Sequence, residues 1–245
     1  MNEKDPTAPQ LNFSEGRATI QLSRPAEHNR IAPGDIGQIM RHLDEIERQK
    51  DTRVLVWTGL GDKTFSSGYT LGAIRNGLDS SFEDMLNRIE AFPLPTICAL
   101  NGSVYGGGTD IAICCDWRIG VQGIRMFVPA ARFGLHYYPG GLRRFVTRLG
   151  PVVTKRIFLT CLPLNDEEML RTGFLQELVQ PDALEAAVET YCTALQEGDA
   201  QAISSMKVNI DALAAGDYDE SFGQTMYRQT LESEELKRRL EKISR

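Results

Sequence analysis

The chain has 245 residues, 42% of them apolar and 24% charged, which is enough to bury a full core as one large or two small domains. No apolar run approaches the roughly 20 residues of a membrane span, and a net charge of −6 without a sustained Lys/Arg stripe gives little support for nucleic-acid binding. The five cysteines lack Cys-x-x-Cys spacing, so we expect reduced core residues of a cytoplasmic protein.

The first half of the chain alternates short apolar runs with amphipathic segments. Residues 1–10 are polar, contain proline and lack the apolar region of a signal peptide, which predicts a flexible tail. We expect two short strands in residues 11–22, a helix over 33–48 with His42 on its solvated side, and a strand over 54–58. This order, repeated along the chain, predicts an α/β fold with parallel pairing.

Two glycine-rich turns each follow a predicted strand. One follows residues 54–58, and the other follows the buried strand 97–100 and leads through Gly106, Gly107 and Gly108 into a helix over 109–115. Glycines at a helix start let the backbone approach a ligand, and the NH groups of the first turn lack intrahelical partners. The sequence therefore predicts an anion-binding backbone, with a simple tight turn as the alternative.

These two stretches, TGLGDKTFSSGYTLGAI and ALNGSVYGGGTDIAICCDWRIG, resemble the paired signatures of the enoyl-CoA hydratase/isomerase (crotonase) superfamily. The resemblance implies an oxyanion hole for an acyl-CoA thioester, with the NH groups of Tyr69 and Gly107 as donors. It also implies a crotonase fold, with repeated ββα units forming a spiral core over 11–195 and a helical trimerisation region over 196–245. Residues expected to contact the substrate or its coenzyme A are His28, Ser66, Ser67, Gly68 and Gly106, although His28 has the alternative of an exposed turn residue.

The residues for proton transfer depart from the family pattern. Asp110, in the first turn after the glycines, matches one of the two catalytic glutamates of the hydratases; the alternative is a carboxylate favoured by the helix dipole. In MFVPAARFGLHYYPGG, Ala130 stands where the second glutamate is expected, and a methyl group transfers no proton. Asp116 matches a structural aspartate.

The same loop offers His136, Tyr137 and Tyr138, near positions that carry catalytic side chains in some relatives. Their alternative role is an aromatic wall of an acyl pocket or of a subunit contact. We expect that adjacent residues do not all face the same side, and that at least one of the three contacts the reacting group.

The remaining segments are predicted helices and one weakly patterned region. Residues 71–84 lack clear patterning and, by the resemblance, shape the acyl pocket. The sequence predicts helices over 82–92, 143–149, 152–160, 166–172, 183–195 and 200–213, and a long charged helix ending the region 217–245. Family members assemble through these last helices into trimers, commonly paired into hexamers.

The resemblance therefore predicts an acyl-CoA enzyme of the hydratase/isomerase type, which would be a lyase or isomerase of fatty acid metabolism. A decarboxylase or C–C hydrolase is the enzymatic alternative, because Ala130 replaces the second glutamate, and an inactive acyl-CoA-binding or assembly protein is the alternative from another class. No G-x-S-x-G elbow, dinucleotide fingerprint or metal-ligand spacing occurs, so we expect no tightly bound cofactor beyond coenzyme A in the substrate.

Overall fold

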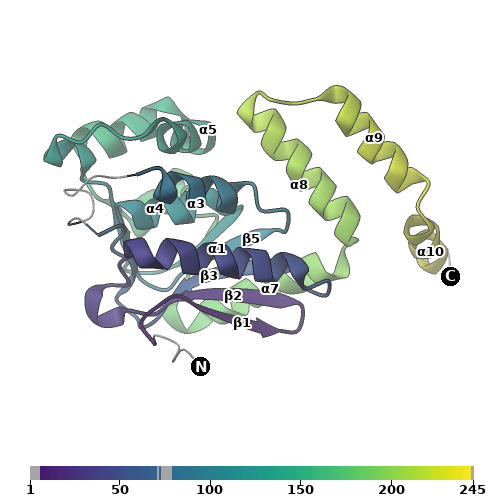
Figure 1. Ribbon diagram of the computed structural model, residues 1–245, viewed down its shortest axis with the longest axis horizontal. Helices are drawn as coiled ribbons and strands as arrows, with labels where there is room; N and C mark the ends of the chain where they lie inside the picture. Colours follow the sequence, from purple (N-terminus) through teal and green to yellow (C-terminus); the bar gives the residue numbers. More distant parts are fainter. Residues whose placement is uncertain (1–5, 71, 73–78, 244–245) are drawn as a thin grey trace.

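The computed structural model describes residues 6–70, 72 and 79–243 (Figure 1). The expected tail and the weakly patterned segment therefore fall partly outside the described residues, at 1–5 and at 71 and 73–78. Pro9 is buried and Gln10 begins the first strand, so the end of the expected tail belongs to the folded core. The body is a spiral of strands and helices, from which the last helices extend to one side (Figure 1).

A six-stranded sheet forms the centre of the body, in the order β1-β2-β3-β5-β7-β10. Its pairs are parallel except β1 with β2, which form an antiparallel hairpin. The strands are β1 (Gln10–Ser14), β2 (Arg17–Leu22), β3 (Val54–Gly59), β5 (Thr96–Leu100), β7 (Trp117–Val121) and β10 (Glu177–Val179). The predicted parallel α/β architecture is thus confirmed.

A second, four-stranded sheet has the order β4-β6-β8-β9 and consists of very short strands. They are β4 (Thr64–Ser66), β6 (Ser103–Tyr105), β8 (Arg125–Phe127) and β9 (Leu164–Asn165). Each turn of the spiral places one strand in each sheet and then forms a helix, as in β3-β4-α3, β5-β6-α4 and β7-β8-α5. Successive turns stack through parallel pairing, so the loops after β4 and β6 lie side by side.

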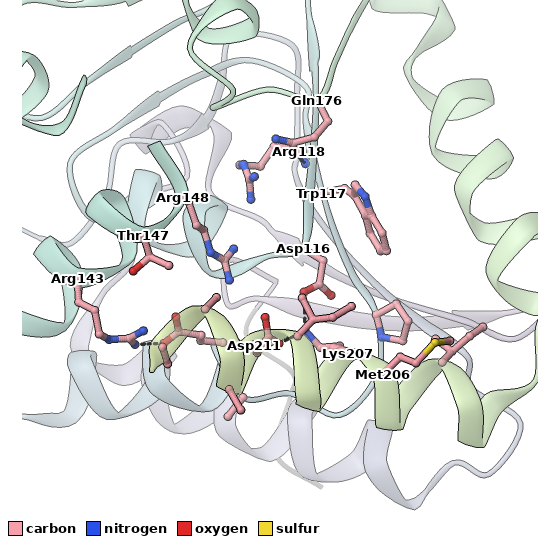
Figure 2. Close-up of a pocket in the computed structure, with 18 of the residues that line it drawn as sticks. Asp116, Trp117, Arg118, Arg143, Thr147, Arg148, Gln176, Met206, Lys207 and Asp211 are labelled. Carbon is pink, nitrogen blue, oxygen red and sulfur yellow. Dashed lines mark hydrogen bonds and ion pairs between the residues drawn. The ribbon is translucent and has the colours of Figure 1, made fainter. Parts of the chain in front are cut away.

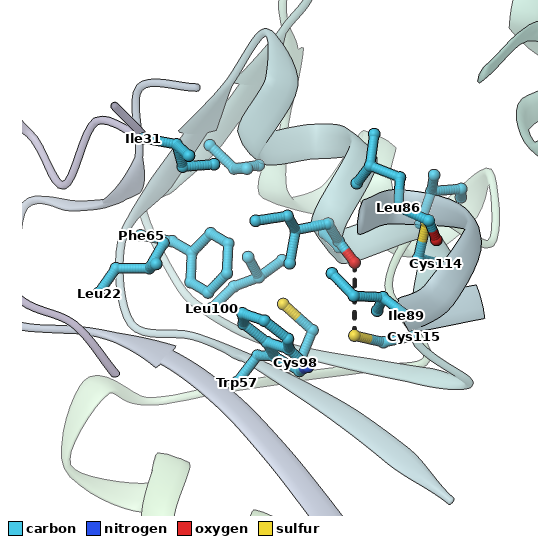
Figure 3. Close-up of a cluster of buried hydrophobic side chains, with 14 of the residues drawn as sticks. Leu22, Ile31, Trp57, Phe65, Leu86, Ile89, Cys98, Leu100, Cys114 and Cys115 are labelled. Carbon is cyan, nitrogen blue, oxygen red and sulfur yellow. Dashed lines mark hydrogen bonds between the residues drawn. The ribbon is translucent and has the colours of Figure 1, made fainter. Parts of the chain in front are cut away.

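Alternating side chains of the central strands pack on opposite faces of the large sheet. On β3, Leu55 and Trp57 face the main core under α1, α3 and α4, whereas Val54 and Val56 face α7. Figure 3 shows this main core, where Trp57 lies among aliphatic side chains near the thiol of Cys98 on β5 and that of Cys115 at the end of α4. The sheet is therefore covered by helices on both faces, as the nearly continuous apolar strands require.

The helices largely follow their predicted positions. They are α1 (Pro33–Arg48), α3 (Ser81–Glu90), α4 (Gly107–Cys114), α5 (Pro139–Lys155), α6 (Asp166–Arg171), α7 (Leu184–Glu197), α8 (Ala200–Ala215), α9 (Glu220–Leu231) and α10 (Glu234–Ile243), with single turns η1 (Pro25–Glu27), η2 (Ala130–Phe133), η3 (Arg156–Thr160) and η4 (Pro181–Ala183). The predicted helices 143–149 and 152–160 are separated by Gly150 and Pro151. In the structure this separation is a kink inside α5, where Gly150 has φ 76°. The charged helix expected at the end of the region 217–245 is α10, and a separate helix, α9, precedes it.

The expectation for His42 was wrong. Its side chain is 8% exposed, and its Nε2 lies 2.9 Å from the carbonyl oxygen of Pro9. The N-terminal segment covers this side of α1, which helical periodicity alone does not show.

The three C-terminal helices leave the body and expose apolar side chains (Figure 1). On α8, Met206, Ile210 and Leu213 are each more than half exposed, as is Tyr227 on α9. Within the described ranges, no helix is both long and apolar enough to cross a bilayer.

Candidate active site

The loop after β4 brings a backbone NH group to the start of α4. The hydroxyl of Ser66 donates to the carbonyl of Asn29 at 2.8 Å and accepts the NH of Gly68 at 3.0 Å. Gly68 has φ +86°, and a Cβ there would lie 2.5 Å from the nitrogen of Gly107. Only glycine therefore allows this close approach of the two loops.

The NH groups of Tyr69 and Gly107 lie next to each other at this junction. A Cβ on Gly107 would be 3.1 Å from the nitrogen of Tyr69 and 2.8 Å from the ring of Phe82. Gly106 precedes the helix with φ +48°, which turns the first NH groups of α4 outward. Neither NH group has an acceptor among the described residues. Both residues are half-buried, so the pair can bind an oxygen that carries negative charge.

Asp110 lies in the first turn of the same helix and is fully buried. Its Oδ2 accepts a hydrogen bond from the hydroxyl of Tyr137, and its Oδ1 accepts one from the hydroxyl of Tyr138 at 2.7 Å. Both carboxylate oxygens are therefore held by neutral donors. The structure thus brings Asp110 together with two of the three candidate residues in the loop.

Both tyrosines face Asp110 whereas His136 is exposed, so the three adjacent residues do not all face the same side, as expected. Tyr138 is the extended N-cap of α5, and its ring stacks on that of Tyr137 with centroids 5.0 Å apart. A Cβ on Gly141 would lie 2.6 Å from the ring of Tyr137 and 2.8 Å from that of Tyr138. The missing side chain at Gly141 therefore provides the space in which the two rings converge on Asp110.

Burial controls the protonation of this group. It raises the pKa of Asp110 to about 6, against the opposing effects of the two tyrosine hydrogen bonds and the charge of Arg144. Burial, followed by the charge of Asp110, also raises the pKa of Tyr137 and of Tyr138. Near neutral pH the carboxyl group can exchange a proton, whereas the tyrosines remain protonated donors.

A buried cation supports the site from α5, and the sequence analysis did not identify it. Arg144 is fully buried; its Nε donates to Glu90 at 2.9 Å and its Nη2 donates to Asn87. Although burial raises the pKa of Glu90, Arg143 and Arg144 hold it below its usual range. This network fixes α5, and with it the tyrosine loop, against α3.

The other candidate residues are more distant from this chemistry. His136 is exposed, and none of the described residues hydrogen-bonds to its ring. His28 is also exposed, with Nδ1 3.0 Å from the hydroxyl of Thr64, and Ser67 is half-buried. The side chain of Ser66 is fully buried and its hydroxyl shapes the loop, and its expected contact with the substrate stays a prediction. Ala130 is 6% exposed and begins η2.

A cavity of about 960 Å³ lies elsewhere, between α8 and the body (Figure 2). Its walls carry Arg118 and Arg148 on the body and Lys207 on α8, and none of the oxyanion-hole or tyrosine-loop residues. Asp116 lies here, where it accepts the Thr96 NH at 2.7 Å and pairs with Lys207 at 2.5 Å. This is the structural role expected for Asp116, and the cavity is separate from the Asp110 site.

Comparisons with known proteins identify the family of this chain. The sequence model of the enoyl-CoA hydratase/isomerase family matches residues 12–242. The chain is 28% identical over 181 residues to a crotonyl-CoA hydratase from Syntrophomonas wolfei, covering 71% of this chain and 70% of that protein. It is likewise 28% identical over 178 residues to a short-chain-enoyl-CoA hydratase from Clostridium acetobutylicum, covering 69% and 68%.

Solved structures show the same fold. An enoyl-CoA hydratase/carnithine racemase from Magnetospirillum magneticum aligns with a TM-score of 0.90 at 22% identity, covering 97% of this chain and 92% of that chain. The expected crotonase fold is thereby confirmed. Because the family model spans nearly the whole sequence, the chain belongs to the enoyl-CoA hydratase/isomerase family.

Proposed function

We propose that this protein is an acyl-CoA isomerase-type enzyme that moves a proton through a thioester enolate. The observation that carries the proposal is Asp110, a fully buried carboxylate held by two tyrosine hydroxyls, one helical turn from the free NH of Gly107. A base and an anion-binding backbone in one place are what enolate formation needs.

In this mechanism the thioester oxygen accepts hydrogen bonds from the NH groups of Tyr69 and Gly107. Asp110 removes a proton from a carbon next to the carbonyl or conjugated with it, and the electron pair moves to the oxygen. Because the two donors are fixed by the Gly68–Gly107 contact, they need no rearrangement as charge develops. Loss of one such donor typically lowers the rate on the order of a hundredfold to a thousandfold.

The pKa of about 6 suits Asp110 for this task. At neutral pH it is largely the carboxylate, yet it is a stronger base than an ordinary aspartate. The two relatives above are named hydratases. The hydration mechanism with two glutamates lacks its second carboxylate here, because the methyl side chain of Ala130 cannot transfer a proton. We therefore favour proton transfer over hydration.

A decarboxylase or C–C hydrolase on a CoA thioester is the second candidate, and Ala130 favours it too. Loss of carbon dioxide forms the same enolate without a base, and a carboxyl group with a pKa of about 6 can then donate a proton to the carbon. The same two NH groups serve both reactions.

We further propose a cytoplasmic protein that uses coenzyme A only as part of its substrate. The five cysteines are buried free thiols, which fits a reducing compartment. The exposed apolar side chains of α8–α10 support assembly into a homotrimer or a hexamer. Light scattering that gives the mass of a single chain would contradict that assembly.

The proposed function is tested by incubating the protein with enoyl-, 3-oxo-, malonyl-type and aryl-CoA thioesters in deuterated water, followed by mass spectrometry. We expect deuterium incorporation and a product, both lost in Asp110→Asn while CoA thioesters still bind. A malonyl-type thioester as the sole reacting substrate would favour the decarboxylase. Binding without any reaction would identify an inactive acyl-CoA-binding protein.

A further inference from the structure

We propose that Glu83 on α3 is the second proton-transfer group of this site and replaces the carboxylate that Ala130 lacks. The inference rests on the proposed function and extends it, because it assigns the group that returns the proton. Three features of the structure carry it: the position of Glu83, its lack of a partner, and the rigidity of Asp110.

Glu83 follows directly after a residue that borders the oxyanion hole. The ring of Phe82 lies 2.8 Å from the Cβ position of Gly107, and its centroid is 4.8 Å from that of Tyr69. Glu83 reaches from the same turn to the start of α5, where its Oε1 lies 2.7 Å from the Cβ position of Gly140. The carboxylate therefore lies beside the start of α5, against a residue two positions after Tyr138.

No described residue forms a hydrogen bond or ion pair with the half-buried side chain of Glu83. The nearest cation is already engaged: Arg144 uses its Nε for Glu90 and its Nη2 for Asn87. Its Nη1 lies 3.6 Å from the Cβ position of Gly140 and is buried without a partner in the described structure. A carboxylate and a cation thus flank Gly140 without pairing with each other.

Asp110 cannot easily serve both halves of the reaction. Tyr137 and Tyr138 hold one oxygen each, and the group is fully buried, so its position relative to the substrate is fixed. Moving a double bond requires proton removal at one carbon and return at another. Glu83 is only half-buried, so water can reach its side chain.

The Asp110 carboxylate takes a proton from one carbon, and the C–H electron pair passes through the conjugated system to the thioester oxygen. The enolate then collapses and its far carbon takes a proton that Glu83 has accepted from water, which leaves Glu83 as a carboxylate. Water carries the proton from Asp110 back to Glu83, so no other reactant is consumed.

The alternative is that Glu83 only stabilises α3, since acidic residues in a first helical turn interact well with the helix dipole. Asp84 is the matched control for this role. It lies in the same turn, carries the same charge and is exposed. A purely dipolar role predicts that Glu83→Gln and Asp84→Asn behave alike.

The test uses the full chain and the reactive thioester from the deuterium experiment. For Glu83→Gln we expect turnover to fall by about a hundredfold to ten-thousandfold, while deuterium exchange at the carbon served by Asp110 continues. Asp110→Asn should lose both exchange and turnover, and Asp84→Asn should lose neither. Glu83→Asp, which keeps the carboxylate, should recover part of the turnover and serves if the glutamine variant does not fold.

The inference would be overturned if Glu83→Gln kept turnover within a few-fold of the wild type. It would also be overturned if a folded Glu83→Gln or Glu83→Asp lost deuterium exchange and turnover equally. Wild-type turnover that proceeds without solvent deuterium in the product would also overturn it, because a single carboxylate then carries the same proton both ways. A wild-type protein that neither exchanges nor converts any thioester would reject the proposed function itself.

Discussion

We expect Asp110→Asn to stabilise the folded protein at neutral pH while it abolishes turnover. Asparagine has nearly the same shape as aspartate, and its amide can accept a hydrogen bond from one tyrosine hydroxyl and donate one to the other. The substitution therefore keeps the packing around Tyr137 and Tyr138 and removes only the buried charge. Sites that hold a charge for chemistry often do so at the expense of stability.

The magnitude follows from the pKa of Asp110, which burial raises from 3.8 to about 6. Between these values the folded state binds the proton more tightly than the unfolded state, so the unfolding free energy falls as pH rises through this range. One pKa unit corresponds to about 1.4 kcal/mol, so the rise corresponds to about 3 kcal/mol lost above pH 7 relative to pH below 4. The group is fully buried, so solvent does not screen this effect.

The assay is urea unfolding of wild type and variant at equal protein concentration from pH 4 to pH 8, followed by the fluorescence of the buried Trp57. The difference in unfolding free energy, variant minus wild type, should grow by about 2 kcal/mol over that range, because part of the total change lies below pH 4. Asp84→Asn, at an exposed carboxylate, controls for the change in net charge. A difference that stays constant with pH, or that favours the wild type above pH 6, would refute the reasoning.

Two further substitutions test the site. Tyr138→Phe removes a donor that lowers the pKa of Asp110, so the acid limb of the rate–pH profile should move to higher pH; an unchanged midpoint would contradict the coupling. Gly68→Ala places a Cβ 2.5 Å from the nitrogen of Gly107 and should lower turnover by about a hundredfold. Gly123→Ala is its control, because Gly123 has φ +83° with nothing within 4 Å, and equal losses in both variants would point to backbone strain alone.

The larger elements of the fold could be predicted because each has a long local pattern. The helix over residues 33–48 has the predicted bounds, and the apolar runs at 54–58 and 97–100 are buried strands of the large sheet. The small sheet was not predicted, since strands of two or three residues are too short to show a period. Their pairing depends on the stacking of successive spiral turns, which is a long-range contact.

The site was predictable only in part, for a similar reason. The glycine spacing and the resemblance indicated Tyr69, Gly107 and Asp110, but the convergence of Tyr137 and Tyr138 depends on the space at Gly141. That space arises where α5 meets the tyrosine loop, and local sequence does not encode it. Glu83 was missed because it reads as an ordinary polar position of an amphipathic helix until α5 is packed beside it.

The short helix α4 explains why the free NH groups can persist at the site. All its residues from Gly108 to Cys114 are buried, so water has little access to the unpaired backbone NH and carbonyl groups at the two ends of the helix. At its C-terminal end, Arg118 donates to the carbonyl of Cys115 at 2.6 Å and Arg148 donates to the carbonyls of the last turn. Burial and the neighbouring Arg148 lower the pKa of Arg118 only to about 10, so Arg118 remains a cation at neutral pH. The negative end of the helix is thus neutralised within the protein, and the positive end at Gly107 remains open for the charge that forms on a substrate.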